Sequence, residues 1–327
     1  MTSSNPQPRY ARRFLFLGLA IAAAVAGYSY AWSYGADIVV REAQAAVAAV
    51  NRDGRRASCE QPEATGFPFR IGITCRRVMY EDARAGVGVR TQGFRSAAQI
   101  YDWSRIVAEL DGPALVEFPG VNALSVNWRL LQSSLRAGEP VPERISVAAD
   151  DLAVALDARG DNDQPLFTAA RAELHARPNG DDVDVALMLR DLATAVQAEG
   201  SQPLQASADL ALAGVARDIA ARSRPQPRSG TIRSAEIGFG EEAGLSFAGP
   251  FSISEDGLLD AELDITVRNA QRLSELLAQA FPQDAGRITT SLAGIAALGD
   301  GATLPLTVRR GEASLGFIAL GSIPPLF

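Results

Sequence analysis

The sequence lacks several residues on which common catalytic chemistries depend. None of its 327 residues is lysine, so all 31 basic residues are arginine. This absence excludes a Walker-type phosphate loop, which needs its lysine. It equally excludes enzymes that form a Schiff base through lysine, including those that use pyridoxal phosphate. We therefore expect no cofactor of these kinds.

Histidine and cysteine are nearly absent as well. His175 is the only histidine and lies in a strand-like segment, and no G-x-S-x-G nucleophile motif occurs. One histidine and two cysteines cannot assemble a typical zinc site. We expect a solvent-facing histidine, no catalytic residue, no metal and no enzymatic activity. A hydrolase acting through carboxylates is the alternative, because the chain holds 38 acidic residues.

The charge pattern excludes one large class of partners. The net charge is −7, and the arginines are scattered rather than gathered in a stripe, so we expect no nucleic-acid binding. Hydrophobic residues make up 47% and charged residues 21%, which is typical of a globular chain. Aromatic residues are only 7%, so alanine, valine, leucine and isoleucine must build the core.

The N-terminus carries the pattern of a membrane anchor. Arg9, Arg12 and Arg13 precede an uncharged run from Phe14 to Ala36. As a helix rising ~1.5 Å per residue, this run could cross a hydrocarbon core of ~30 Å. Basic residues before the run place the N-terminus in the cytoplasm. Aromatic rings that favour the membrane interface cluster at its far end: Tyr28, Tyr30, Trp32 and Tyr34.

A cleaved signal peptide is the alternative reading of this segment. Residues Ala24, Val25 and Ala26 form an A-x-A cleavage site. We favour the uncleaved anchor, because the apolar run continues well past Ala26. Both readings export the rest of the chain. The expectation is therefore a single-pass inner-membrane protein with its C-terminal domain in the periplasm.

Export would place Cys59 and Cys75, the only cysteines, in a compartment where a disulfide can form. A disulfide persists in an oxidising compartment, and a turn region from Pro62 to Pro68 lies between the two residues. We expect Cys59 and Cys75 to form a disulfide across neighbouring strands. Two unpaired buried thiols are the alternative.

The hydrophobic periodicity predicts a mainly β fold, a β-rich α+β class, after an N-terminal helical region. Residues 1–36 are the cytoplasmic start and anchor, and residues 37–56 a helical stem with apolar residues at helical spacing. From residue 57 to 327 the period becomes 2, as in Asp182–Leu189 and Leu259–Val267. We expect a long antiparallel meander forming a curved or folded sheet. The polar stretch 222–230 is a candidate boundary between two lobes.

Two short segments within the β region have the spacing of helices. Asn269–Phe281 places its leucines on one face, with Asn269 as N-cap and Pro282 as stop. Asn127–Ala137 carries Trp128, Leu131 and Leu135, and we predict a helix there too.

Residues Gly66, Phe67, Pro68, Phe69 and Arg70 form a compact G-F-P-F-R motif between the two cysteines. Glycine permits a backbone approach that a side chain would block, and proline belongs at a strand start or edge. Alternation would direct both phenylalanines to one face, which we expect to be the core. The motif is interpreted as a structural corner, with a ligand contact as the alternative.

This motif, the flanking cysteines and the ending from Gly311 to Leu326 resemble the domain of unknown function 2125 family of Gram-negative envelope proteins. The resemblance covers nearly the whole chain. It implies an N-terminal anchor and a periplasmic domain, and it supplies no catalytic residues. The long-stranded pattern is also similar to that of AsmA-type lipid-handling groove proteins, an analogy of fold alone.

Two functions are compatible with these observations. A mean hydropathy of +0.03 and long alternating strands suggest a non-enzymatic envelope protein that binds lipid in an apolar β groove. The alternative is an envelope scaffold, in which an edge strand or the segment Pro324–Leu326 recruits another envelope protein.

Overall fold

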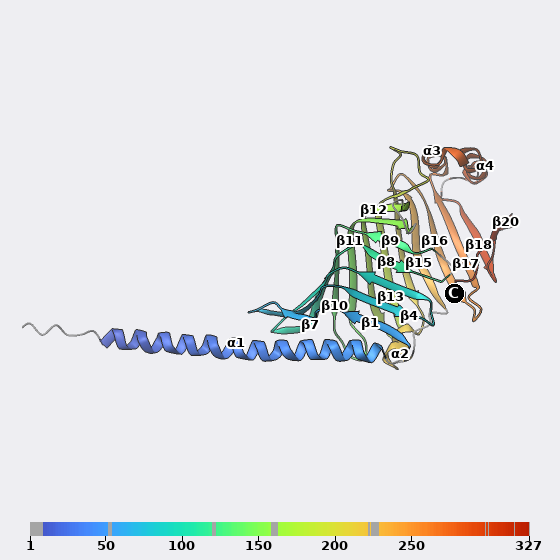
Figure 1. Cartoon of the computed structure of the whole chain (residues 1–327). Coiled ribbons are helices and arrows are strands. Elements are labelled where there is room, and N and C mark those ends of the chain that lie inside the picture. Colours follow the sequence, from blue (N-terminus) through green and yellow to red (C-terminus); the bar gives the residue numbers. More distant parts are fainter. Residues whose placement is uncertain are drawn as a thin grey trace, which may run out of the picture.

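A single long helix precedes the β-sheet (Figure 1). The computed structural model describes residues 9–51, 54–119, 122–157, 163–221, 223, 229–297, 299, 301–316 and 318–326. Helix α1, Arg9–Val50, joins the apolar run and the predicted stem without a break. Within the described residues it is the one helix long and apolar enough to cross a membrane. Its C-terminal part contacts the first three strands.

The strands differ in length and form one antiparallel sheet, which confirms the predicted fold class. From the eleventh strand onward, each strand pairs with the next in a meander. These strands are β11 (Arg144–Leu156), β12 (Gln164–Asn179), β13 (Asp182–Thr194), β14 (Leu204–Leu212), β15 (Ser229–Phe239), β16 (Ala243–Ile253), β17 (Leu259–Arg268), β18 (Thr303–Arg309), β19 (Glu312–Leu315) and β20 (Ile318–Ser322). The alternating segments in β13 and β17 are thus confirmed as strands.

On its other side the sheet divides at β11. The first half of β11 pairs with β10, and its second half pairs with β9. One branch continues through β10 (Leu130–Arg136), β7 (Asp102–Leu110), β6 (Phe94–Gln99), β3 (Arg70–Cys75) and β2 (Glu63–Thr65). The other continues through β9 (Leu124–Asn127), β8 (Ala114–Glu117), β5 (Val87–Thr91), β4 (Val78–Asp82) and β1 (Arg55–Cys59).

A disulfide joins these two branches. Cys59 at the end of β1 bonds to Cys75 at the end of β3, with the two Cα atoms 5.3 Å apart. The predicted pairing is confirmed. The bond does not cross one strand pair, however, because β1 pairs with β4 whereas β3 pairs with β2 and β6. It therefore connects β1, the last strand of one branch, to β3, the strand before the last in the other branch.

Short helices lie at both ends of the long strands, with α3 and α4 at one end and α2 at the other, near the end of α1 (Figure 1). Helix α3, Ala270–Ala280, begins after Asn269, whose side chain accepts a hydrogen bond from the Arg272 backbone N–H. This helix is confirmed as predicted. The 3-10 turn η1 (Pro282–Asp284) and helix α4 (Ala285–Ala296) follow it, and α2 (Val215–Ala220) lies between β14 and β15.

The predicted helix over Asn127–Ala137 is wrong, because this segment forms β10. Leu131 and Leu135 are four residues apart, a spacing that fits one face of a helix and equally one face of a strand. The segment is a strand because it is hydrogen-bonded to β7 on one side and to β11 on the other.

The candidate boundary at 222–230 falls largely outside the described residues. On either side of it, β14 and β15 pair directly, with Leu212 opposite Gly230. The two flanking segments therefore belong to one continuous sheet.

Candidate functional site: the two faces of the sheet

One face of the sheet is apolar across ten strands. Because antiparallel partners share a face, the strand register defines cross-strand rows of side chains. The central row of this apolar face has serine as its single polar member: Ala108, Ser133, Val147, Leu174, Leu187, Ala208, Ala235, Phe247, Ile265 and Leu304.

The neighbouring rows have the same character. One holds Leu131, Ala149, Ala172, Leu189, Ala206, Ile237, Leu245 and Val267, and the other holds Ile106, Leu135, Ile145, Ala176, Val185, Leu210 and Ile232. We call these three rows the apolar face.

Much of the apolar face stays in contact with solvent. Ile145 and Leu187 are each 39% exposed and Ile237 is 37% exposed, although all three lie on central strands. Full burial of such a side chain is worth about 1.5–3 kcal/mol, so each of these residues leaves part of that free energy unrealised. An apolar occupant would recover it.

Full burial is concentrated at one end of this face. Leu273 and Leu276 of α3 pack with Phe239 and Val267 in the main hydrophobic cluster, and Leu292 of α4 completes it. Leu245 and Ile265 of the apolar face pack against the same cluster. The helices thus close the end of the face that lies far from α1.

The opposite face is polar. Its row beside the central apolar one contains Glu109, Gln132, Ala148, Glu173, Met188, Ser207, Glu236, Ser246, Thr266 and Thr303. Because successive residues of a strand point to opposite faces, one apolar and one polar face account for the period-2 pattern in the sequence. We call this side the polar face.

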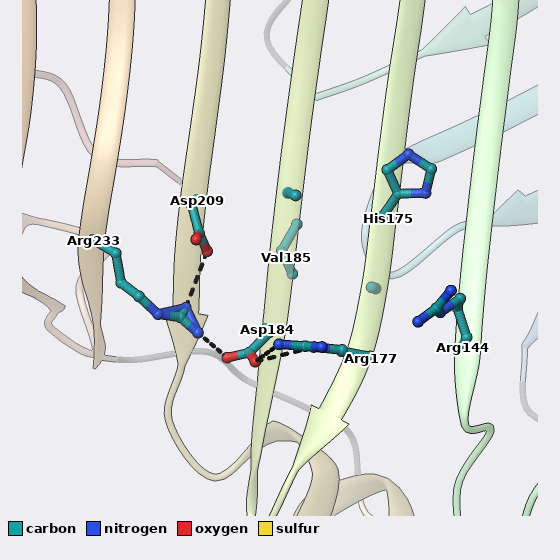
Figure 2. Close-up of a pocket in the computed structure, with 9 residues that line it drawn as sticks. Arg144, His175, Arg177, Asp184, Val185, Asp209 and Arg233 are labelled. Atoms are coloured by element: carbon teal, nitrogen blue, oxygen red, sulfur yellow. Dashed lines mark hydrogen bonds and ion pairs between the residues drawn. The ribbon is translucent and has the colours of Figure 1, made fainter.

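The polar face contains a shallow pocket built on ion pairs (Figure 2). Asp184 is nearly buried and accepts hydrogen bonds from Arg233 and Arg177, and Arg233 also reaches Asp209 at 3.0 Å. Burial alone would raise the pKa of Asp184, but hydrogen bonds from Arg233 and Asn179 and the charge of Arg233 outweigh it and lower the pKa. An ionised, doubly paired carboxylate is suited to cross-linking strands rather than to proton transfer.

His175 lies in the same pocket and faces solvent, as predicted. Its Nδ1 is 2.9 Å from Ser146 Oγ on the paired strand, and its Nε2 is 3.7 Å from Glu173. A hydrogen bond from Arg171 at 2.5 Å holds Glu173 and lowers the pKa of that carboxyl.

This Ser-His-Glu grouping lacks the features of a catalytic triad. Ser146 lies within β11, which is paired on both sides, so the neighbouring backbone N–H groups are used in the ladder and cannot form an oxyanion hole. The 3.7 Å between His175 and Glu173 is also beyond hydrogen-bond distance. Alternation places Glu173 and His175 on one face of β12, whereas Ser146 of β11 meets them only through strand register.

The G-F-P-F-R motif forms a tight turn that enters β3. Gly66 has φ +110°, and a Cβ there would lie 2.9 Å from the Arg70 backbone, so the turn requires glycine as expected. The Phe67–Pro68 peptide bond is cis. The prediction that both phenylalanines enter the core is wrong: Phe67 is 52% and Phe69 68% exposed. Alternation applies to extended strands, whereas these residues lie in a turn.

The motif contacts α1 instead. Trp32 Nε1 donates to the Arg70 carbonyl at 2.9 Å, and the Tyr28 hydroxyl donates to the Pro68 carbonyl. The Trp32 ring packs edge-on against Phe67 with centroids 5.4 Å apart. Two of the four aromatic residues predicted to lie at the membrane interface thus hold the motif.

Within the described residues, no group of three or more histidine, cysteine, aspartate or glutamate side chains is arranged to hold a metal ion. The features that remain are a two-faced antiparallel sheet and an apolar N-terminal helix fastened to it by the G-F-P-F-R turn.

These features define a β-sheet domain attached to a hydrophobic helix. The chain belongs to the family described as an uncharacterised protein conserved in bacteria (DUF2125), whose model matches residues 32–324. No curated protein and no solved structure matches the chain.

Proposed function

We propose that this protein is a membrane-anchored, non-enzymatic envelope protein that binds lipid on the apolar face of its sheet. The observation that carries the proposal is the continuity of that face over ten strands while residues such as Leu187 stay substantially exposed. Acyl chains match such a surface, because they offer apolar area without polar groups that would lose hydrogen bonds.

The proposed location supports this role. α1 would span the inner membrane once, uncleaved, with the sheet in the periplasm. Arginines before the apolar run favour that orientation, and the Cys59–Cys75 disulfide suits an oxidising compartment. A lipid-binding face attached to the bilayer would then stand next to its source of lipid.

The proposal is tested by comparing variants on the two faces of β13 and β15, which flank β14. Leu187→Gln and Ile237→Gln introduce amides on the apolar face, whereas Ala186→Gln and Glu236→Gln change their neighbours on the polar face. The full-length proteins are purified in mild detergent, and bound phospholipid is measured by native mass spectrometry.

We expect the first pair of variants to lose bound lipid and the second pair to keep the wild-type amount. Lipid held around α1 is common to all four proteins and cancels in the comparison. Equal lipid occupancy in both pairs, or wild-type protein that is repeatedly lipid-free, would contradict the proposal.

A scaffold role is the second candidate, and the sheet edge favours it. In the described part of the chain β20 pairs only with β19, which leaves its outer edge open for an added strand. The C-terminal segment is less suited to recruit a partner, because the Leu326 N–H donates to the Gly257 carbonyl at 2.9 Å. Cross-linking from Leu320 on β20 in intact envelopes would recover a partner protein if this role holds.

A further inference from the structure

Exposed aromatic side chains gather beside α1 on two adjacent turns. Phe67 and Phe69 lie in the turn before β3, and Tyr101 and Trp103 lie at the turn between β6 and β7. All four are more than half exposed. The turns are neighbours, since the Ile100 N–H donates to the Phe69 carbonyl at 3.2 Å. We call these four residues the aromatic tip.

The depth of the aromatic tip follows from its contacts with α1. The uncharged run begins at Phe14, and about 20 helical residues are needed to cross ~30 Å of hydrocarbon, which ends the crossing near residue 33. Phe67 packs against Tyr28 and Trp32, within the last five or so residues of that crossing. The aromatic tip therefore reaches the level at which the bilayer ends.

The charges next to the tip fit lipid headgroups. Arg70 closes the G-F-P-F-R turn, and Arg105 lies two residues after Trp103 on the same face of β7. Arg105 is directly opposite Arg136, which is directly opposite Arg144. Arg136 forms an ion pair with Glu143 at 2.8 Å. Like charges placed opposite one another across strands are unfavourable by themselves, so phosphate groups beside Arg105 would reduce the repulsion that remains.

From these observations we infer a second membrane contact: the aromatic tip inserts into the headgroup boundary of the bilayer that α1 enters, with Arg70 and Arg105 facing lipid phosphates. The rings of Tyr101 and Trp103 carry a polar group and favour this boundary, and Phe67 and Phe69 add apolar surface that can insert beside them. Two separate contacts, the helix and the tip, would fix the orientation of the sheet relative to the membrane. The inference rests on the proposed anchor but not on lipid binding by the apolar face.

Bromolipid quenching of a fluorophore at the tip tests this contact in the full-length chain. Tyr101→Cys and Val196→Cys are labelled with an environment-sensitive dye, because the two residues are similarly exposed, at 75% and 78%. Val196 lies at the α3 end of the strands, where the Ala198 N–H donates to Ala280. Leu17→Cys, inside the apolar run, is the reference for full insertion.

In nanodiscs with brominated phosphatidylcholine, we expect the dye at position 101 to lose a substantial part of the emission lost at position 17. The dye at position 196 should lose none. Absence of quenching at 101 with clear quenching at 17 would overturn the inference, and would point to a protein partner for the tip.

Two further variants separate this contact from the proposed function. In the Tyr101→Cys background, Phe69→Ser with Trp103→Ser should reduce quenching, whereas Ile237→Gln on the apolar face should leave it unchanged. Loss of quenching with Ile237→Gln alone would instead mean that lipid held on the sheet produced the signal. Unchanged thermal unfolding midpoints of the labelled proteins establish that the variants are folded.

Discussion

Removing the Cys59–Cys75 disulfide should destabilise the two N-terminal branches of the sheet and leave the C-terminal meander largely intact. The bond spans 16 residues of sequence, and closing a loop of this size constrains the unfolded chain by about 3 kcal/mol in the chain-entropy model. The bond joins β1 to β3, which do not pair with each other. When it is lost, the contacts that remain beside it are the β1–β4 ladder and the backbone hydrogen bonds of Glu60 with Arg76 and Arg77.

The appropriate change is Cys59→Ala with Cys75→Ala, since Cys75 is almost fully buried and serine would place a hydroxyl in an apolar site. For a domain of this size, 1 kcal/mol corresponds to about 2–4 °C in Tm, so a fall of about 6–12 °C is expected. Thermal unfolding of the full-length protein in detergent measures it.

Hydrogen exchange followed by mass spectrometry locates the effect. We expect faster exchange in β1 to β5 and unchanged exchange in β13 to β17. Uniformly faster exchange across the sheet, or a Tm within 2 °C of wild type, would mean that this bond does not hold the branches together.

Two other changes test individual contacts. Gly66→Ala should cost about 1–3 kcal/mol, because its φ is positive and its Cβ would meet the Arg70 backbone. Gly180→Ala, with positive φ but open space, should cost less in the same denaturant titration. Asp184→Asn should cost about 1–2 kcal/mol at neutral pH, measured against wild type. Because the folded pKa of Asp184 is lowered, this stabilisation is complete above the unfolded value of 3.8 and is lost as pH falls through the folded value. A difference that persists unchanged to the lowest pH would contradict the ion-pair assignment.

The sequence predicted those elements whose signal is local. Alternation over Asp182–Leu189 and Leu259–Val267 indicated strands, and Asn269 and Pro282 marked the ends of α3. The helical stem predicted over residues 37–56 is confirmed as far as Val50, where α1 ends, and is wrong for Arg55 and Arg56, which lie in β1. In each case the residues that determine the element lie within it or directly beside it.

The sequence could not predict features that depend on distant partners. The division at β11 arises because two halves of one strand pair with β10 and β9, and neither half carries a distinguishing pattern. Leu131 and Leu135 fit both periods, so only pairing identified β10. Phe67 and Phe69 are apolar, and their place outside the core follows from a turn held by Tyr28 and Trp32, about 40 residues earlier.

The sequence predicted that the sheet would have an apolar face, but it did not identify the residues that form this face. Alternating strands predicted an apolar side to the sheet, and the register then aligned that side into three rows. The aromatic tip was missed because Tyr101 and Trp103 are separated from the G-F-P-F-R motif by some 30 residues. Aromatic residues near a turn can indicate a binding surface, but a membrane contact can be inferred for them only once the structure places them beside α1.

Photo-cross-linking from two adjacent residues of β13 would show whether lipid lies on the apolar face in the cell. Leu187 belongs to the apolar face and Ala186 to the polar face, so a photoreactive amino acid at each position samples opposite sides of one strand. In intact cells, we expect phospholipid adducts at position 187 and none at position 186. Equal yields of lipid adducts at both positions, or protein adducts alone at 187, would contradict it.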